Sequence, residues 1–216
     1  MRAPIIGLWF ADKPDFRETF IRTSTAITHR DPRAVEAALI IAEAAACAGS
    51  TIRDSEEILT RLEKIIISEE MKIRFANLRE HLASRQSVGV YADSFSRKTG
   101  FVSGFAPDTA AVAIYAWLLH RGDFTATIEA VVRAGGDTDT VAFVAGAISG
   151  AEAGIDGLNS SWLAILTDWP LSVCYMKNIS ETGTGNFPRW PLLLVRNIVF
   201  LAIVLTHGFR RLFPPY

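Results

Sequence analysis

The chain has 216 residues, of which 50% are hydrophobic and 21% are charged, and its formal net charge is −1. This composition predicts one globular domain over residues 1–216 with a sizeable core. The near-neutral charge argues against a general nucleic-acid binder. The only two cysteines, Cys47 and Cys174, lie far apart in apolar contexts. We interpret them as buried thiols in a reducing, cytoplasmic compartment, which argues against a disulfide framework.

The N-terminal half has apolar residues at helical spacing. A first helix is predicted within residues 12–28. Asp31 is predicted to cap a second helix that begins at Pro32, and the apolar surface of that helix indicates a position deep in the core. Two amphipathic helices are then predicted over residues 54–66 and 71–82, covering the core with one face each.

The middle of the chain alternates between a loose segment and further helices. Residues 85–107 contain several glycines and one proline, which is typical of a loop. Asp108 or Thr109 is predicted to cap a helix over residues 110–119. A short helix over residues 123–133 is predicted to lead into a pair of glycines.

That pair opens the most distinctive stretch of the sequence, in which Gly135 and Gly136 are followed by Asp-Thr-Asp-Thr. Glycines adopt positive φ without strain and allow a tight turn. One interpretation is a helix start, because Asp and Thr are preferred capping residues. A second carboxylate two residues after the first adds repulsion unless a cation lies between them, and Mg²⁺ prefers such oxygen ligands. A capped helix and a metal site involving Asp137, Asp139 and Thr140 therefore both remain open.

Small residues then recur at helical spacing over residues 141–154, among them Ala142, Gly146 and Gly150. A face of this kind lets another helix approach closely. Because acidic residues flank the segment, we expect a core helix here and no membrane segment. A short helix is expected over residues 161–167.

Residues 191–213 form the most hydrophobic segment and are predicted to be a C-terminal helix. A membrane span needs about 20 mostly apolar residues, and Arg196 and Asn197 interrupt this one. The uninterrupted part, residues 198–205, favours a buried helix. A membrane span and contact with a membrane surface remain as alternatives.

The distinctive stretch, Gly-Gly-Asp-Thr-Asp-Thr followed by Val-Ala-x-x-Ala-Gly-Ala-x-x-Gly-Ala, resembles the signature of the ADP-ribosylglycohydrolases, the dinitrogenase-reductase-activating glycohydrolase family. The resemblance extends over most of residues 1 to about 170. It implies an all-α, compact helical bundle that hydrolyses the bond between ADP-ribose and a modified side chain or small acceptor. It also implies two Mg²⁺ or Mn²⁺ ions, with Asp137, Asp139 and Thr140 as ligands.

Two further segments resemble parts of this family that lie near the ligand. One contains Thr28 and His29 before a helix. Taken without the resemblance, this pair is better explained by a capping threonine and a histidine packed on a helix end, whereas the resemblance favours a ligand-side role for His29. The other is the loop that leads through Gly-Phe-Ala-Pro-Asp-Thr into the helix after residue 107. The ligand-binding residues implied by the resemblance are His29, Ser103, Gly104, Phe105, Gly135 and Gly136.

The sequence departs from the family in one respect. Residues 1–8 resemble an internal segment, and the upstream Thr-Asp-Asp metal motif is absent from the 216 residues. We therefore expect an N-terminally truncated form of the fold that keeps half of the metal site. The catalytic acid residues of the family come from the upstream part, so no general acid or base is assigned.

The expected function is a Mg²⁺-dependent ADP-ribosylglycohydrolase acting on an ADP-ribosylated protein or small molecule. One alternative is a catalytically incomplete relative or fragment that binds only ADP-ribose or metal, and weakly. Another is a small membrane-associated helical protein built around residues 191–213. Neither a nucleic acid nor a membrane is expected as a partner, and arginine, serine and small-molecule acceptors all remain open.

Overall fold

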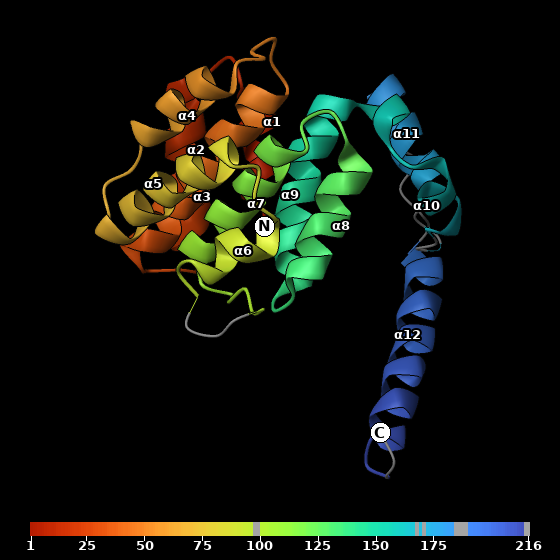
Figure 1. The fold of residues 1–216 in the computed structure, drawn as a ribbon. Coiled ribbons are helices and arrows are strands. Elements are labelled where there is room, and N and C mark those ends of the chain that lie inside the picture. The colour runs from red at the N-terminus through yellow and green to blue at the C-terminus, as the bar shows by residue number, and fades with distance from the viewer. Residues whose placement is uncertain (97–99, 167–168, 170–171, 184–189, 214–216) are drawn as a thin grey trace. The chain divides into compact units, whose positions relative to one another are not determined.

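The computed structural model describes residues 1–96, 100–166, 169, 172–183 and 190–213. These residues are predominantly α-helical, and their β-structure is confined to one isolated bridge, which confirms the all-α prediction (Figure 1). The chain divides into two compact units, Met1–Leu158 and Asn159–Tyr216. Each unit is described by itself, and the single domain over residues 1–216 stays a prediction.

The first unit contains nine α-helices and a short 3-10 helix within its described residues. They are α1 (Ala3–Trp9), α2 (Pro14–Ala26), α3 (Pro32–Ala48), α4 (Ser55–Glu63), α5 (Glu69–Ala83), α6 (Val88–Asp93), α7 (Ala106–Leu119), α8 (Phe124–Ala134), α9 (Thr138–Ala153) and η1 (Ile155–Gly157).

Helices α3, α7 and α9 contact one another at the centre of this unit, with α1 packed on α3 and α8 packed on α9 (Figure 1). Every residue of α7 from Pro107 to Leu118 is buried. Helix α3 is buried along most of its length, as its sequence predicted. The three central helices therefore form the core of this unit, and the loop before α7 and the turn before α9 lie at their ends.

Local sequence explains why the N-terminal helices begin where they do. The Asp31 carboxylate accepts a hydrogen bond from Arg33 N at 2.9 Å, and Pro32 is the first residue of α3, as predicted. The Asp54 side chain caps α4 in the same way, by accepting from Glu56 N at 3.0 Å.

Helix α1 was not predicted, because seven residues give too little periodicity to recognise. It packs on α3 at Gly7, where an added Cβ would lie 2.2 Å from the backbone oxygen of Ala42. This contact between backbones is possible only because Gly7 has no side chain.

The close approach expected at the small-residue face of α9 is present. A Cβ added to Gly146 would lie 2.9 Å from Ile128 Cδ1, and one added to Gly150 would lie 3.7 Å from Phe124 Cε2. Both neighbours belong to α8, so α8 and α9 are tightly packed just after the turn that joins them.

The predicted start of α7 is wrong. The helix begins at Ala106, after Phe105 as N-cap, and no side chain caps it. Pro107 already has the backbone angle of a first turn, which accounts for the earlier start. Asp108 and Thr109 both lie inside the helix and are buried. The Asp108 carboxyl group pairs there with Arg74 from α5.

The second unit contains α10 (Ser160–Ile165), α11 (Val173–Thr182) and α12 (Trp190–Arg210) among its described residues. Helix α12 forms where a hydrophobic helix was predicted, but the prediction that residues 198–205 are buried is wrong, since no residue of α12 is buried. The prediction for Cys174 is also wrong, because its side chain is exposed. Cys47 of the first unit is buried as predicted, and burial raises the pKa of its thiol to about 11.

Candidate functional site

Two glycines form the turn between α8 and α9. Gly135 and Gly136 have φ angles of 76° and 81°, which residues with a side chain rarely adopt. A Cβ on Gly136 would lie 2.2 Å from the backbone oxygen of Val102, and one on Gly135 would lie 2.6 Å from that of Gly100. The turn therefore needs glycine both for its backbone angles and for its contact with the loop before α7.

That contact is an isolated parallel bridge between Val102 and Gly136. Val102 N donates to Gly135 O at 3.3 Å, and Asp137 N donates to Val102 O at 2.8 Å. The bridge fixes Asp137 at the start of α9 and brings residues 100–105 beside it. Sequence reasoning missed this pairing, since nothing in two separate glycine-containing segments shows that they meet.

Two carboxyl groups meet at the N-terminus of α9. Asp137 is the N-cap residue, but its side chain makes no capping hydrogen bond. Asp139 is exposed and accepts a hydrogen bond from Thr140 N at 3.0 Å. A side-chain hydrogen bond with Asp137 and, after it, the Thr140 N–H lower the pKa of Asp139. The arrangement differs from a simple capped helix, because the Asp137 side chain caps none of the free N–H groups of α9.

Gly104 lies directly against this pair. A Cβ added to Gly104 would be only 2.7 Å from Asp137 Oδ2. The backbone of the loop before α7 can therefore approach the Asp137 carboxyl group only because residue 104 is glycine.

The oxygens present suit a hard divalent cation in part. Paired carboxylates and a hydroxyl are ligands that Mg²⁺ and Mn²⁺ prefer, and Asp137, Asp139 and Thr140 would supply them. Within the part of the chain that the structure describes, no three His, Cys, Asp or Glu side chains converge on one point. These residues therefore fit one side of a coordination shell.

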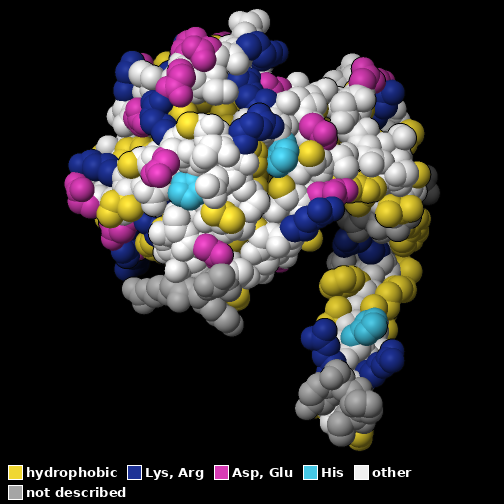
Figure 2. Space-filling view, in the orientation of Figure 1, with side chains coloured by type: hydrophobic (Ala, Val, Ile, Leu, Met, Phe, Trp, Pro, Cys, Tyr) yellow, Lys and Arg dark blue, Asp and Glu magenta, His cyan; other side chains and the backbone are white. Residues whose placement is uncertain are grey.

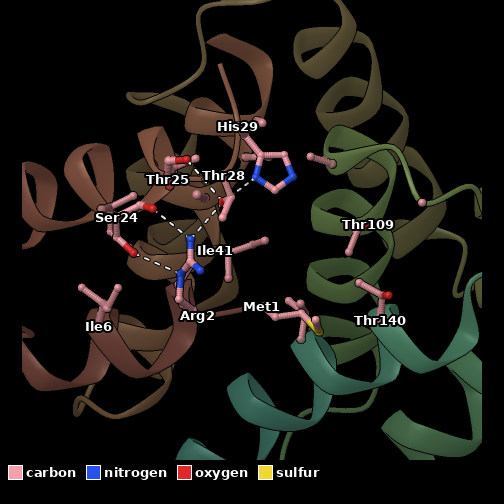
Figure 3. Close-up of a pocket in the computed structure, with 18 residues that line it drawn as sticks. Met1, Arg2, Ile6, Ser24, Thr25, Thr28, His29, Ile41, Thr109 and Thr140 are labelled. Carbon is pink, nitrogen blue, oxygen red and sulfur yellow. Dashed lines mark hydrogen bonds between the residues drawn. The ribbon is translucent and has the colours of Figure 1, made fainter. Parts of the chain in front are cut away.

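A pocket of about 360 Å³ lies next to this site (Figure 3). It is bounded by α1, the end of α2, α3, the loop before α7, and the first turns of α7 and α9. The pocket brings together three of the predicted site residues, namely His29, Gly104 and Thr140. Of the other predicted residues, Gly135, Gly136, Asp137 and Asp139 form the adjoining turn and carboxyl pair.

One wall of the pocket is a chain of hydrogen bonds that ends at His29 (Figure 3). Arg2 donates to the Ser24 hydroxyl at 3.1 Å, to Ser24 O at 2.8 Å and to the Thr28 hydroxyl at 3.0 Å. The Thr28 hydroxyl in turn lies 2.9 Å from His29 Nδ1. His29 is exposed at the pocket, with its ring oriented by Thr28, and it does not pack into the core.

Thr109 is a lining residue that sequence reasoning assigned to another role. It lies in the first turn of α7 and is only 5% exposed. Its Oγ1 is buried without a hydrogen-bond partner among the described residues. A buried polar atom without a partner is costly, and Thr109 is among the residues that line a pocket large enough to hold a ligand group. No signal in the sequence distinguishes this threonine from an ordinary cap.

Ser103 and Phe105 flank Gly104 but do not line the pocket. The Ser103 hydroxyl donates to Asp108 Oδ2 at 2.5 Å and accepts from Phe105 N at 3.2 Å. The Arg33 guanidinium lies over the Phe105 ring, with its Cζ atom 5.0 Å from the ring centre. Both residues hold the shape of the loop that carries Gly104.

The sequence matches the ADP-ribosylglycohydrolase family over residues 1–185. A protein from Archaeoglobus fulgidus, described as uncharacterized, is 29% identical over 171 residues, which are 78% of this chain and 52% of that protein. The chain thus spans about half the length of this relative.

Proposed function

The chain belongs to the ADP-ribosylglycohydrolase family, and we propose that it is a Mg²⁺- or Mn²⁺-dependent hydrolase that removes ADP-ribose from a modified side chain or small acceptor. The observation that carries the proposal is the glycine turn. It places the Asp137–Asp139 carboxyl pair and the Thr140 hydroxyl beside a pocket. The substrate would be an ADP-ribosylated protein or small molecule, and the working compartment the cytoplasm.

A bound divalent ion would supply a water of lowered pKa and a fixed orientation for the reacting groups. Asp137, Asp139 and Thr140 would hold that ion through their oxygens. Gly104 and Gly136 would shape the site, because without side chains they let the loop before α7 pack against the Asp137 carboxyl group and the turn before α9. His29, held by Thr28, would bind the ligand from the opposite side of the pocket.

One observation favours a second candidate function. Because no three metal-binding side chains converge among the described residues, the metal affinity of this chain is expected to be low. The chain would then bind ADP-ribose or metal weakly without cleaving a bond. The lack of an assigned general acid among the described residues also fits this binding-only alternative.

Release of free ADP-ribose tests the proposal. The full chain is incubated with arginine-linked and serine-linked ADP-ribosylated peptides, with and without Mg²⁺, and its metal-dependent release is compared with that of two variants. Asp139→Asn removes a proposed ligand, and we expect at least a tenfold loss, since one charged ligand contributes more than about 1.4 kcal/mol. Asp156→Asn changes an exposed aspartate beyond the other end of α9 and is expected to retain the activity.

Calorimetric titration of the same proteins with ADP-ribose separates the two candidates. Metal-dependent release that Asp139→Asn abolishes supports the hydrolase. Binding of ADP-ribose without release from either peptide supports the binding-only relative. If a folded chain neither binds nor releases ADP-ribose, both are contradicted.

A further inference from the structure

Helix α12 is largely apolar, and none of its residues is buried among the described residues. It extends over 21 residues, Trp190–Arg210, and its most apolar 18 residues have a mean hydropathy of 2.0. Figure 2 shows hydrophobic side chains along it and basic side chains near its C-terminal end. A helix that is hydrophobic all round needs either a protein core or a lipid environment around it.

The length of α12 matches a bilayer. At 1.5 Å per residue, 21 residues extend over about 31 Å, close to the roughly 30 Å of a hydrocarbon core. Two kinds of helix resemble a membrane span in composition, namely the core helix of a soluble protein and an N-terminal signal sequence. Helix α12 differs from both, since among the described residues it is unburied and since it lies at residues 190–210.

The polar residues of α12 lie where a bilayer tolerates them. Arg196 is six residues from Trp190, about 9 Å along the axis, so its long side chain can reach the interface at that end. The stretch from Ile198 to Leu205 carries no charge. The helix has a tryptophan at its start and Arg210 in its last turn, and such aromatic and basic residues are typical of membrane interfaces.

The family match also separates α12 from the proposed hydrolase site. It ends at residue 185, before Trp190, and all the site residues belong to the unit Met1–Leu158. The helix thus lies outside the residues that match the family. We propose that α12 inserts into a lipid bilayer and tethers the preceding residues to the membrane surface.

Membrane flotation of the full chain tests the tether. Membranes of bacterial cells that produce the chain are washed with alkaline carbonate, which removes surface-bound proteins, and are then floated through a sucrose gradient. Leu201→Arg places a charge near the middle of α12, and Ile73→Arg places the same charge on α5. Leu201 and Ile73 have the same exposed fraction, 56%. We expect the wild type and Ile73→Arg to float with the lipid, and Leu201→Arg to float at least tenfold less.

Three results would overturn the proposal. They are a wild-type chain that stays soluble as a monomer, a soluble oligomer in which α12 is covered by a second copy, and flotation that Leu201→Arg leaves unchanged. Measuring ADP-ribose release on the same samples keeps the tether separate from the proposed function. A floating but inactive chain contradicts only the hydrolase, and an active but soluble chain contradicts only the tether.

Discussion

At the scale of single residues, Thr109 is the clearest indication that the pocket is built for a ligand. Its buried hydroxyl has no partner among the described residues, whereas the equally buried Thr127 donates its hydroxyl to Asp123 O at 2.8 Å. An unpaired buried hydroxyl loses its hydrogen bonds to water on folding and forms none within the protein. A polar ligand atom in the pocket would restore one of them.

Replacing Thr109 by valine keeps the shape and removes the hydroxyl. We expect Thr109→Val to raise the free energy of unfolding of the ligand-free chain by about 1 kcal/mol and to weaken ADP-ribose binding about tenfold. Urea unfolding and calorimetric titration measure the two effects. Thr127→Val is the control and should lower the free energy of unfolding by about 1 kcal/mol, because its hydroxyl is paired. Unchanged ADP-ribose affinity in Thr109→Val would show that the hydroxyl does not contact the ligand.

At the scale of elements, the turn between α8 and α9 depends on a backbone contact. Gly136 and Gly122 have almost the same φ, 81° and 80°, but only Gly136 faces a neighbour, since nothing lies within 4 Å of a Cβ built on Gly122. Gly122→Ala should therefore cost only the backbone strain, about 1 kcal/mol. Gly136→Ala must also displace Val102, so we expect it to cost at least about 2 kcal/mol more and to abolish ADP-ribose binding.

Thermal unfolding and ADP-ribose titration of the two glycine variants check this expectation. Equal stabilities would mean that the bridge between Val102 and Gly136 does not constrain the turn. Retained binding in Gly136→Ala would mean that the position of Asp137 does not depend on the bridge.

The elements also show what local sequence can and cannot predict. Helices α3, α4 and α5 follow from apolar periodicity and from caps within a few residues, as at Asp31 and Asp54. The bridge between Val102 and Gly136 and the ion pair between Arg74 and Asp108 each join residues more than thirty positions apart. Local sequence patterns do not indicate such distant pairs. The exposure of α12 could not be predicted either, because buried helices and lipid-facing helices have the same composition.

At the scale of the whole molecule, one ion pair near each end of α7 ties it to a neighbouring helix, the first buried and the second partly buried. Arg74 of α5 donates to Asp108 of α7 through Nε at 2.8 Å, and Asp108 also holds the Ser103 hydroxyl. Near the C-terminus of α9, Glu152 pairs with Arg121 and accepts from Trp117 Nε1 at 2.6 Å. The first pair adjoins the loop that carries Gly104. Glu152 is 13 residues from Asp139, which places it about 20 Å away along α9.

These pairs allow stability to be separated from function. Asp108→Asn leaves the buried Arg74 without its counter-charge, so we expect it to lower the free energy of unfolding by about 3 kcal/mol. Glu152→Gln does the same to the partly buried Arg121 and should lower the free energy of unfolding by less. Only Asp108→Asn should also weaken ADP-ribose binding, because it loosens Ser103 and with it the loop that presses Gly104 against Asp137. Urea unfolding and titration, at a temperature where both variants remain folded, measure the two quantities. If Glu152→Gln weakened binding as much, the pocket would depend on the stability of the whole bundle, and the buried Arg74–Asp108 pair would have no specific part in positioning the site.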